Sequence, residues 1–154
     1  MRLYLVHHGD AVGPKVDPAR PLSERGLLEV DAIALQAAQR GVRPAFIWHS
    51  GKLRAQQTAE AFLHLCSPSA GISAARGLQP ADPPEWIRDS LAGEERDVMV
   101  VGHFPHLPGL LRLLLFNDAD AAGAGFPLHG LVALERAGER WVERWRIGGT
   151  VPQA

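Results

Sequence analysis

Three short segments of the chain place histidine, serine or arginine side chains directly after apolar runs. They are His7-His8-Gly9-Asp10, His49-Ser50 with Arg54 shortly after it, and Gly102-His103. A neutral imidazole can attack a phosphorus atom, while a guanidinium and a second imidazole offset charge on the phosphoryl oxygens. If the segments meet in the fold, these residue types suit chemistry on a tetrahedral dianion, with His8 as the nucleophile.

The segments would meet if each of them followed a strand of one parallel sheet. Apolar, β-favouring runs precede all three, at 3–6, 45–48 and 97–101. Ligands of α/β proteins bind outside the carboxyl ends of such strands. The pattern therefore predicts that the polar segments gather at one edge of the sheet.

Helices are predicted between these strands. The first covers 24–40, because Ser23 is typical of an N-cap and Gly41 of the residue that ends a helix. Its expected core-facing side chains are Leu27, Val30, Ala34 and Ala37, with Leu28 and Leu35 beside them. Further helices are predicted over 52–65, over 83–91 after a capping pair of Asp82 and Glu85, and over 107–116.

Three weaker strand signals complete the pattern. One lies at 71–75, and two at 128–135 and 140–147 are joined by a glycine-containing turn, which is typical of a hairpin. The alternation predicts an α/β fold of three layers: a mainly parallel sheet, helices on both of its faces and a C-terminal antiparallel hairpin. Without internal repeats or a linker, residues 1–154 are expected to form a single domain.

Composition narrows the class of protein. A net charge of −1 gives no reason to expect nucleic acid or an anionic membrane as a partner. No apolar run approaches the roughly 20 residues of a membrane span, and the first predicted strand begins too early for a signal peptide. Cys66 is the only cysteine, so no intrachain disulfide can form. We expect a cytoplasmic protein.

The polar segments resemble the motifs of the histidine phosphatase superfamily. Residues 6–11 (VHHGDA) look like its Arg-His-Gly signature, and residues 101–105 (VGHFP) look like its Gly-His-x-Pro. Residues 50–59 (SGKLRAQQTA) are similar to its Ser-Pro-x-x-Arg-Ala-x-Gln-Thr-Ala segment. Residues 20–26 (RPLSERG) resemble the Arg-Pro-Leu-Thr-x-x-Gly stretch of the SixA-type branch, the phosphohistidine phosphatases. The four segments follow the family order over nearly the whole chain.

This resemblance implies a phosphoglycerate mutase-like fold and a metal-independent phosphatase that needs no cofactor. It implies that His8 is transiently phosphorylated, that Arg54 binds the phosphoryl group and that His103 stabilises its charge. Arg20 is a candidate for the same phosphate-binding pocket, with an ion pair inside its loop as the alternative.

The resemblance leaves the proton donor open. The phosphoglycerate-mutase-like branch uses a glutamate after the third strand, and residues 77–80 offer none, as in the SixA-type proteins. Asp10 is a candidate donor, or else it caps or braces its loop. A phosphorylated histidine needs less help from an acid, because the leaving imidazole is easily protonated near neutral pH. This favours phosphohistidine in a protein as the substrate over a small phosphoester.

His7 departs from the signature, which has arginine at this position. Arginine supplies a permanent charge and two parallel donors, whereas histidine supplies one donor at a time and is only partly charged at pH 7. The loss of a charge-assisted contact costs about 1.5–3 kcal/mol, or about ten- to a hundredfold in rate. We therefore expect His7 to bind phosphate weakly and activity to be reduced, less so at mildly acidic pH where His7 would be charged.

Other functions stay open on the sequence alone. The loss of the arginine allows a low-activity or non-catalytic module that binds phosphate or a phosphoprotein, and a small-molecule phosphomonoesterase of the same superfamily is a further alternative. His7, His8, Asp10 and His103 could surround a metal ion in a hydrolase, although no local motif such as His-Glu-x-x-His is present. The other histidines, His49, His64, His106 and His129, are expected to be packed or solvated, and among them His106 is the one expected to border the pocket. The sequence does not indicate an oligomeric state.

Overall fold

The computed structural model describes residues 1–148 of the chain. Its strands are β1 (Arg2–His7), β2 (Phe46–His49), β3 (Gly71–Ala74), β4 (Val98–Gly102), β5 (Leu131–Ala137) and β6 (Arg140–Ile147). Its helices are α1 (Glu24–Gln39), α2 (Leu53–Cys66), α3 (Glu85–Leu91) and α4 (His106–Phe116).

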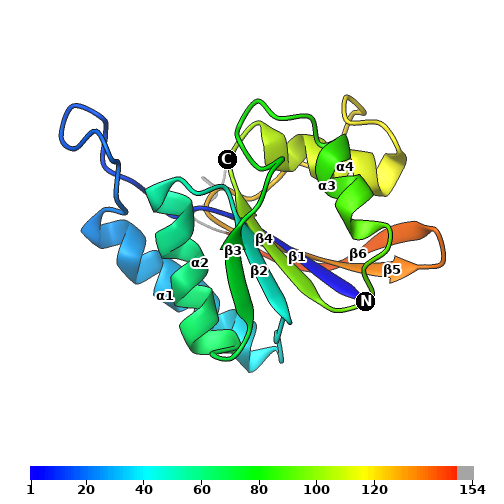
Figure 1. Cartoon of the computed structure of the whole chain (residues 1–154), viewed down its shortest axis with the longest axis horizontal. Helices are drawn as coiled ribbons and strands as arrows, with labels where there is room; N and C mark the ends of the chain where they lie inside the picture. The colour runs from blue at the N-terminus through cyan, green and yellow to red at the C-terminus, as the bar shows by residue number, and fades with distance from the viewer. Residues whose placement is uncertain (149–154) are drawn as a thin grey trace.

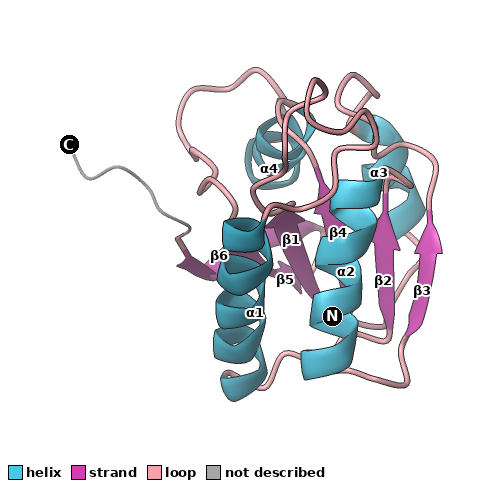
Figure 2. Cartoon of the chain, turned by 90° about the vertical axis from the view of Figure 1, so that its left-hand side faces the viewer, coloured by secondary structure: helices cyan, strands magenta, loops and turns pink. Residues whose placement is uncertain are grey.

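The strands form one six-stranded sheet in the order β3-β2-β4-β1-β5-β6. The first four strands in sequence are parallel, and the β5–β6 hairpin extends the sheet, with β5 antiparallel to β1 and β6 antiparallel to β5. Helices α1 and α2 lie on one face of the sheet, and α3 and α4 lie on the other (Figure 1). Figure 2 shows α1 and α2 in front of the strands. The predicted α/β fold of three layers, with a mainly parallel sheet and a terminal hairpin, is confirmed.

The central strands are buried on both faces, as expected for strands that are covered by helices on each side. In β1, Tyr4 and Val6 pack toward α1 and α2, whereas Leu3 and Leu5 pack toward α3 and α4. All five residues of β4 are buried. The ends of these two strands are thereby held rigidly at the edge of the sheet where the candidate site lies.

The predicted buried face of α1 is partly wrong. Leu27, Leu28 and Leu35 are 47%, 73% and 50% exposed, and Ile33 is buried instead. The helix meets the sheet along residues at three- and four-residue spacing: Gly26, Val30, Ile33, Ala34 and Ala37. Each step along a helix turns by about 100°, so a leucine directly after Gly26 points away from that face.

The predicted capping pair before α3 is also wrong. Asp82 Oδ2 accepts a hydrogen bond from the N–H of Gln79 at 3.0 Å, and α3 begins only at Glu85. Pro83 and Pro84 stand between them and have no N–H to offer a cap. Asp82 therefore closes the preceding turn rather than the helix.

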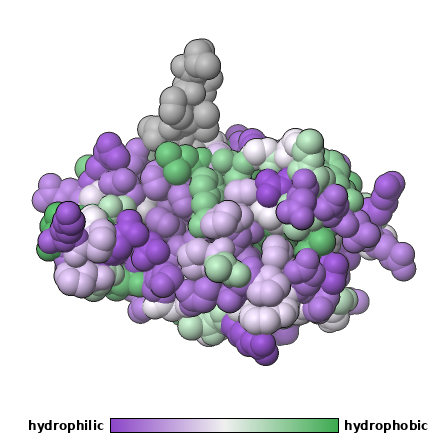
Figure 3. Space-filling view, turned by 90° about the horizontal axis from the view of Figure 1, so that it is seen from above, coloured by the Kyte–Doolittle hydropathy of each residue, from purple (hydrophilic) through white to green (hydrophobic). Residues whose placement is uncertain are grey.

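No helix among the described residues is both long enough and apolar enough to cross a membrane. On the face seen from above, hydrophilic side chains predominate and apolar ones form scattered patches (Figure 3).

Candidate active site

The carboxyl ends of β1, β4 and β2 lie next to one another, as the sequence predicts. His7 is paired with Gly102 across β1 and β4, and His49 is paired with Val101 across β2 and β4. The three polar segments that follow these strands therefore meet at one edge of the sheet.

His8 lies immediately beyond β1 and is held in a defined tautomer. Its Nδ1 is 2.7 Å from the carbonyl oxygen of Gly9, which can only accept, so Nδ1 carries the proton and Nε2 keeps a free lone pair. Burial, together with the charge of Arg54 and against the opposing effect of the Gly9 hydrogen bond, lowers the pKa of His8 to about 4. At neutral pH the ring is thus a neutral imidazole whose Nε2 can act as a nucleophile.

Thr58 connects the loop that carries His8 to helix α2. Its Oγ1 accepts the N–H of Gly9 at 3.0 Å and donates to the carbonyl of Arg54 at 2.8 Å. Thr58 is fully buried, so the link is protected from water. A single hydroxyl therefore fixes the backbone beside His8 relative to the first turn of α2. Thr58 is not among the predicted site residues, although it lies in the 50–59 segment.

Arg54 stands in the first turn of α2, where the helix dipole disfavours a cation. Its Nε is buried and has no hydrogen-bond partner among the described residues. Its charge is close enough to lower the pKa of His7, His8 and His103. An anion bound here would satisfy the donor and relieve the repulsion, so this end of α2 is suited to an oxyanion.

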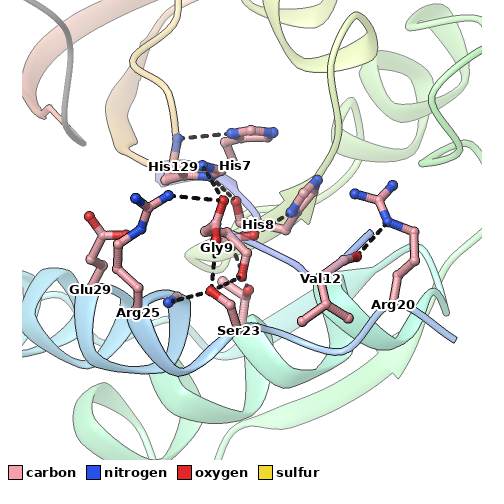
Figure 4. Close-up of polar contacts among 12 residues, drawn as sticks. His7, His8, Gly9, Val12, Arg20, Ser23, Arg25, Glu29 and His129 are labelled. Carbon is pink, nitrogen blue, oxygen red and sulfur yellow. Dashed lines mark hydrogen bonds and ion pairs between the residues drawn. The ribbon is translucent and has the colours of Figure 1, made fainter. Parts of the chain in front are cut away.

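Arg20 lies on the loop between β1 and α1, close to the same point. Its Nε donates to the carbonyl of Val12 at 3.0 Å (Figure 4), and its backbone is left-handed with φ 49°. Its charge lowers the pKa of both His8 and Arg54. Arg20 makes no ion pair with a carboxylate within residues 1–148, which favours the pocket over the alternative of a loop ion pair.

His103 follows β4 and is almost completely buried. Its Nε2 is 2.6 Å from Oγ of Ser50, which also accepts the N–H of Lys52 at 3.3 Å. The ring centroids of His8 and His103 are 5.0 Å apart. Burial, and then the proximity of His8, lowers the pKa of His103 to about 3. Ser50, which belongs to the predicted polar segment after β2 but had no role assigned to it, thus orients His103 toward the site.

The ring of His7 is buried and packs against two other aromatic rings. It stacks on Phe104 at 4.0 Å and on His129 at 4.9 Å between ring centroids. Its Nδ1 accepts the backbone N–H of His129 at 2.8 Å, so the proton of the neutral ring is on Nε2. Burial, followed by the proximity of His8, lowers the pKa of His7 to about 2. The expectation that His7 becomes charged at mildly acidic pH is therefore wrong for the free protein.

His129 is a residue of the site that the sequence analysis placed among the packed or solvated histidines. It lies in a turn just before β5, with φ 53°, and its Nδ1 donates to the carbonyl of His8 at 2.7 Å (Figure 4). His106, the one of these histidines expected to border the pocket, is 2% exposed in the first turn of α4, whereas His129 contacts residues 7 and 8 directly. No local motif marks His129.

Asp10 braces the loop after β1. Its Oδ2 accepts the Ser23 hydroxyl at 2.7 Å, and its Oδ1 is 3.2 Å from the Arg25 guanidinium. The Ser23 hydrogen bond lowers the pKa of the Asp10 carboxyl, and Arg25 lowers it further. An ionised carboxylate has no proton to donate, so the geometry favours bracing, the second of the two predicted roles.

The close approach of α1 to this loop explains one glycine of the 20–26 segment. A Cβ at Gly26 would lie 2.1 Å from the carbonyl oxygen of Asp10, far inside van der Waals contact. Only a residue without a side chain lets the first turn of α1 come this close to the backbone of Asp10. The N–H of Gly26 donates to Oγ of Ser23, so the N-cap of the helix depends on this close approach. The segment therefore positions Asp10 and, through the chain, His8.

The sequence itself matches no family model and no curated protein. Its structure is similar to an Agrobacterium tumefaciens protein assigned as the phosphohistidine phosphatase SixA, at 29% identity and a TM-score of 0.78, over 96% of this chain and 97% of that one. It is also similar to the protein histidine phosphatase SixA in complex with tungstate, at 20% identity and a TM-score of 0.83, over 97% of each chain. The chain has the fold of the histidine phosphatase superfamily.

The superfamily fold is shared by structures with other substrates in their names. One is a mycobacterial glucosyl-3-phosphoglycerate phosphatase in complex with VO3, at 18% identity and a TM-score of 0.71, over 94% of this chain and 98% of that one. Tungstate and vanadate are oxyanions that imitate phosphate. The fold thus accommodates phosphate-like anions in these relatives.

Proposed function

We propose that this chain is a metal-independent phosphatase that forms a phosphohistidine intermediate on His8 and acts on phosphohistidine in proteins. The observation that carries the proposal is the state of His8 beside Arg54. An unprotonated Nε2, fixed by the Nδ1–H bond to Gly9, lies within the electrostatic reach of a buried guanidinium with an unpartnered donor. A nucleophile next to an anion-binding cation is what transfer of a phosphoryl group requires.

In the first step, the phosphoryl oxygens bind Arg54 and the N-terminus of α2. Nε2 of His8 attacks phosphorus, a P–N bond forms, and the bond from phosphorus to the leaving group breaks with its electron pair. The phosphorylated ring is then positively charged and still carries its proton on Nδ1. The carbonyl of Gly9 accepts from that Nδ1–H and so stabilises the charge.

In the second step, water attacks the phosphorus of phospho-His8. The P–N bond breaks, its electron pair returns to Nε2, and inorganic phosphate leaves. His103, oriented by Ser50, and His7, with its proton on Nε2, are the further donors proposed for the phosphoryl oxygens. Both are uncharged in the free protein, and a bound dianion would raise their pKa values.

The state of Asp10 supports phosphohistidine as the substrate. A phosphoester releases an alkoxide that needs a strong proton donor, whereas an imidazole leaving group is protonated near neutral pH without one. The Asp10 carboxyl is held ionised by Ser23 and Arg25. The names of the two SixA structures point the same way. On this proposal the substrate is a cytoplasmic signalling protein.

Two alternatives rest on particular observations. A small phosphoester substrate is favoured by the similarity to the sugar-phosphoglycerate phosphatase. A module that binds phosphate with little turnover is favoured by the neutral, enclosed ring of His7 where the signature has a cation.

Turnover assays separate these functions. Wild type, His8→Ala and the exposed control His64→Ala are compared on a phosphohistidine peptide and on p-nitrophenyl phosphate, with and without EDTA. We expect turnover of the peptide by wild type and His64→Ala, none by His8→Ala, and no effect of EDTA. Turnover of the ester alone would establish the first alternative, and phosphate binding without turnover the second. Activity that is lost in EDTA and restored by a metal would refute the proposed mechanism.

A further inference from the structure

Three imidazole rings gather beside the proposed nucleophile. His7 and His8 come from the end of β1 and His129 from the turn before β5, and each offers a ring nitrogen within 4.8 Å of the other two. The rings of His7 and His129 are parallel, while the ring of His8 is tilted by 52° from that of His129. His129 has no place in the proposed catalytic steps.

Two of the three rings are already in the state of a metal ligand. Nδ1 of His8 donates to the carbonyl of Gly9, and Nδ1 of His129 donates to the carbonyl of His8, each at 2.7 Å. In its neutral form each ring therefore has a free lone pair on Nε2. Metal-binding histidines have the same arrangement, with the second N–H donated to a backbone carbonyl or a carboxylate that fixes the ring.

We propose that His8, His129 and His7 form a binding site for Zn²⁺, and that the ion inhibits the phosphatase by occupying Nε2 of His8. Binding of the ion does not depend on the function of the protein. Its inhibitory effect rests on the proposed role of His8 as the nucleophile.

The ligand set decides the choice of ion. Imidazole nitrogen suits Zn²⁺ and its transition-metal neighbours, whereas Mg²⁺ and Ca²⁺ prefer oxygen. Three protein ligands with an open fourth position are a common zinc arrangement, with Zn–N bonds of about 2.0–2.1 Å. Ligand nitrogens on one tetrahedral ion lie roughly 3.4 Å apart, so the three rings, whose nitrogens lie within 4.8 Å of one another, must reorient and close in to share the ion.

His7 is the weakest of the three ligands. Its Nδ1 accepts the N–H of His129, so its proton is on Nε2, and the ring can ligate only by moving that proton and losing the bond. The positive charges of the nearby arginines disfavour a cation at this site. The carboxylate of Asp10 partly offsets these charges, since its Oδ1 is 4.0 Å from Nε2 of His129. An arginine at position 7 would remove a ligand and add a positive charge. The departure from the signature therefore creates the site.

Calorimetric titration with ZnCl₂, on tag-free and metal-free protein, tests the binding. We expect one Zn²⁺ per wild-type chain, affinity weaker by more than about tenfold in His8→Ala, His129→Ala and His7→Arg, and unchanged affinity in His64→Ala. Mg²⁺ should produce no binding heat. His129→Gln, which keeps a polar side chain, replaces His129→Ala if circular dichroism shows that the alanine variant is unfolded.

The outcomes separate this site from the proposed function. Wild-type affinity in folded His8 and His129 variants, or absence of Zn²⁺ binding by wild type, would overturn the site. Inhibition by Zn²⁺ that EDTA reverses supports the second half of the proposal, and Zn²⁺ that binds without inhibiting would overturn it. If the metal-free protein has no phosphatase activity, the proposed function fails while the titration still decides whether the site exists.

Discussion

The backbone N–H of His129 donates a hydrogen bond to Nδ1 of His7 across 2.8 Å. This contact joins the turn before β5 to the end of β1 and fixes the proton of the neutral His7 ring on Nε2. The position that holds a cation in the superfamily signature therefore holds an oriented, uncharged donor in this chain.

Replacing His7 by arginine should increase activity. A charge-assisted contact to a phosphoryl oxygen is stronger than a neutral one, so we expect kcat/KM for phosphohistidine to rise about ten- to a hundredfold at pH 7. Because burial holds the pKa of His7 near 2, the ratio of the two proteins should stay constant between about pH 5 and 8. His7→Gln, which adds no charge, is the control. Equal or lower activity in a folded His7→Arg protein would refute this account of His7.

His8 should titrate well below an ordinary histidine. Burial lowers its pKa to about 4, so Nε2 keeps its lone pair through neutral and mildly acidic pH. NMR titration of the ring signals of the phosphate-free protein measures this directly. A midpoint for His8 near the ordinary value of about 6.5 would show that burial does not control this ring.

The stability of the protein should fall in acid, because burial also keeps other histidine rings of the site uncharged. His7 and His103 stay neutral in the folded protein, with pKa values of about 2 and 3. The unfolded chain takes up protons below about pH 6.5, so the stabilisation is fully present above that pH and is lost as the pH falls.

Urea unfolding at pH 7 and pH 5.5 measures this loss. Each of the two histidines contributes a slope of up to about 1.4 kcal/mol per pH unit to the free energy of unfolding. The free energy of unfolding of His103→Asn should depend less steeply on pH than that of wild type. The difference should correspond to the uptake of about one proton fewer on unfolding. The same slope in both proteins would mean that His103 is protonated in the fold.

Thr58 should be needed for both stability and catalysis. In Thr58→Val the N–H of Gly9 loses its buried acceptor, which costs about 1–3 kcal/mol of unfolding free energy. The loop that orients His8 is also released from α2, so kcat should fall more than KM changes. Thr58→Ser keeps the hydroxyl and should retain most of both properties. A valine variant with wild-type kcat would show that the link does not position His8.

The fold could be predicted from the sequence because its signals are local. Apolar runs and helix caps mark the strands and helices, and most predicted boundaries lie within a few residues of the observed ones. The buried face of α1 could not be chosen correctly, since Leu27 and Ile33 both lie on apolar stripes and only the position of the sheet distinguishes them.

The part of the candidate site that follows directly on the strands could be predicted from the sequence. His8, Arg54 and His103 belong to segments that a parallel sheet must bring together. His129 could not be found, because its place depends on a turn that folds over the end of β1. The charge of His7 was also mispredicted, since burial by Phe104 and His129 is a property of the packed structure.

The central claim is that His8 carries the phosphoryl group during turnover. Its most direct test is mass spectrometry of protein that is quenched rapidly under alkaline conditions during turnover of a phosphohistidine peptide, since phosphohistidine is labile in acid. We predict one phosphoryl group on the peptide that contains His8, lost on brief acid treatment and absent from His8→Ala. Undiminished turnover by His8→Ala, or a phosphoryl group on another residue, would contradict it.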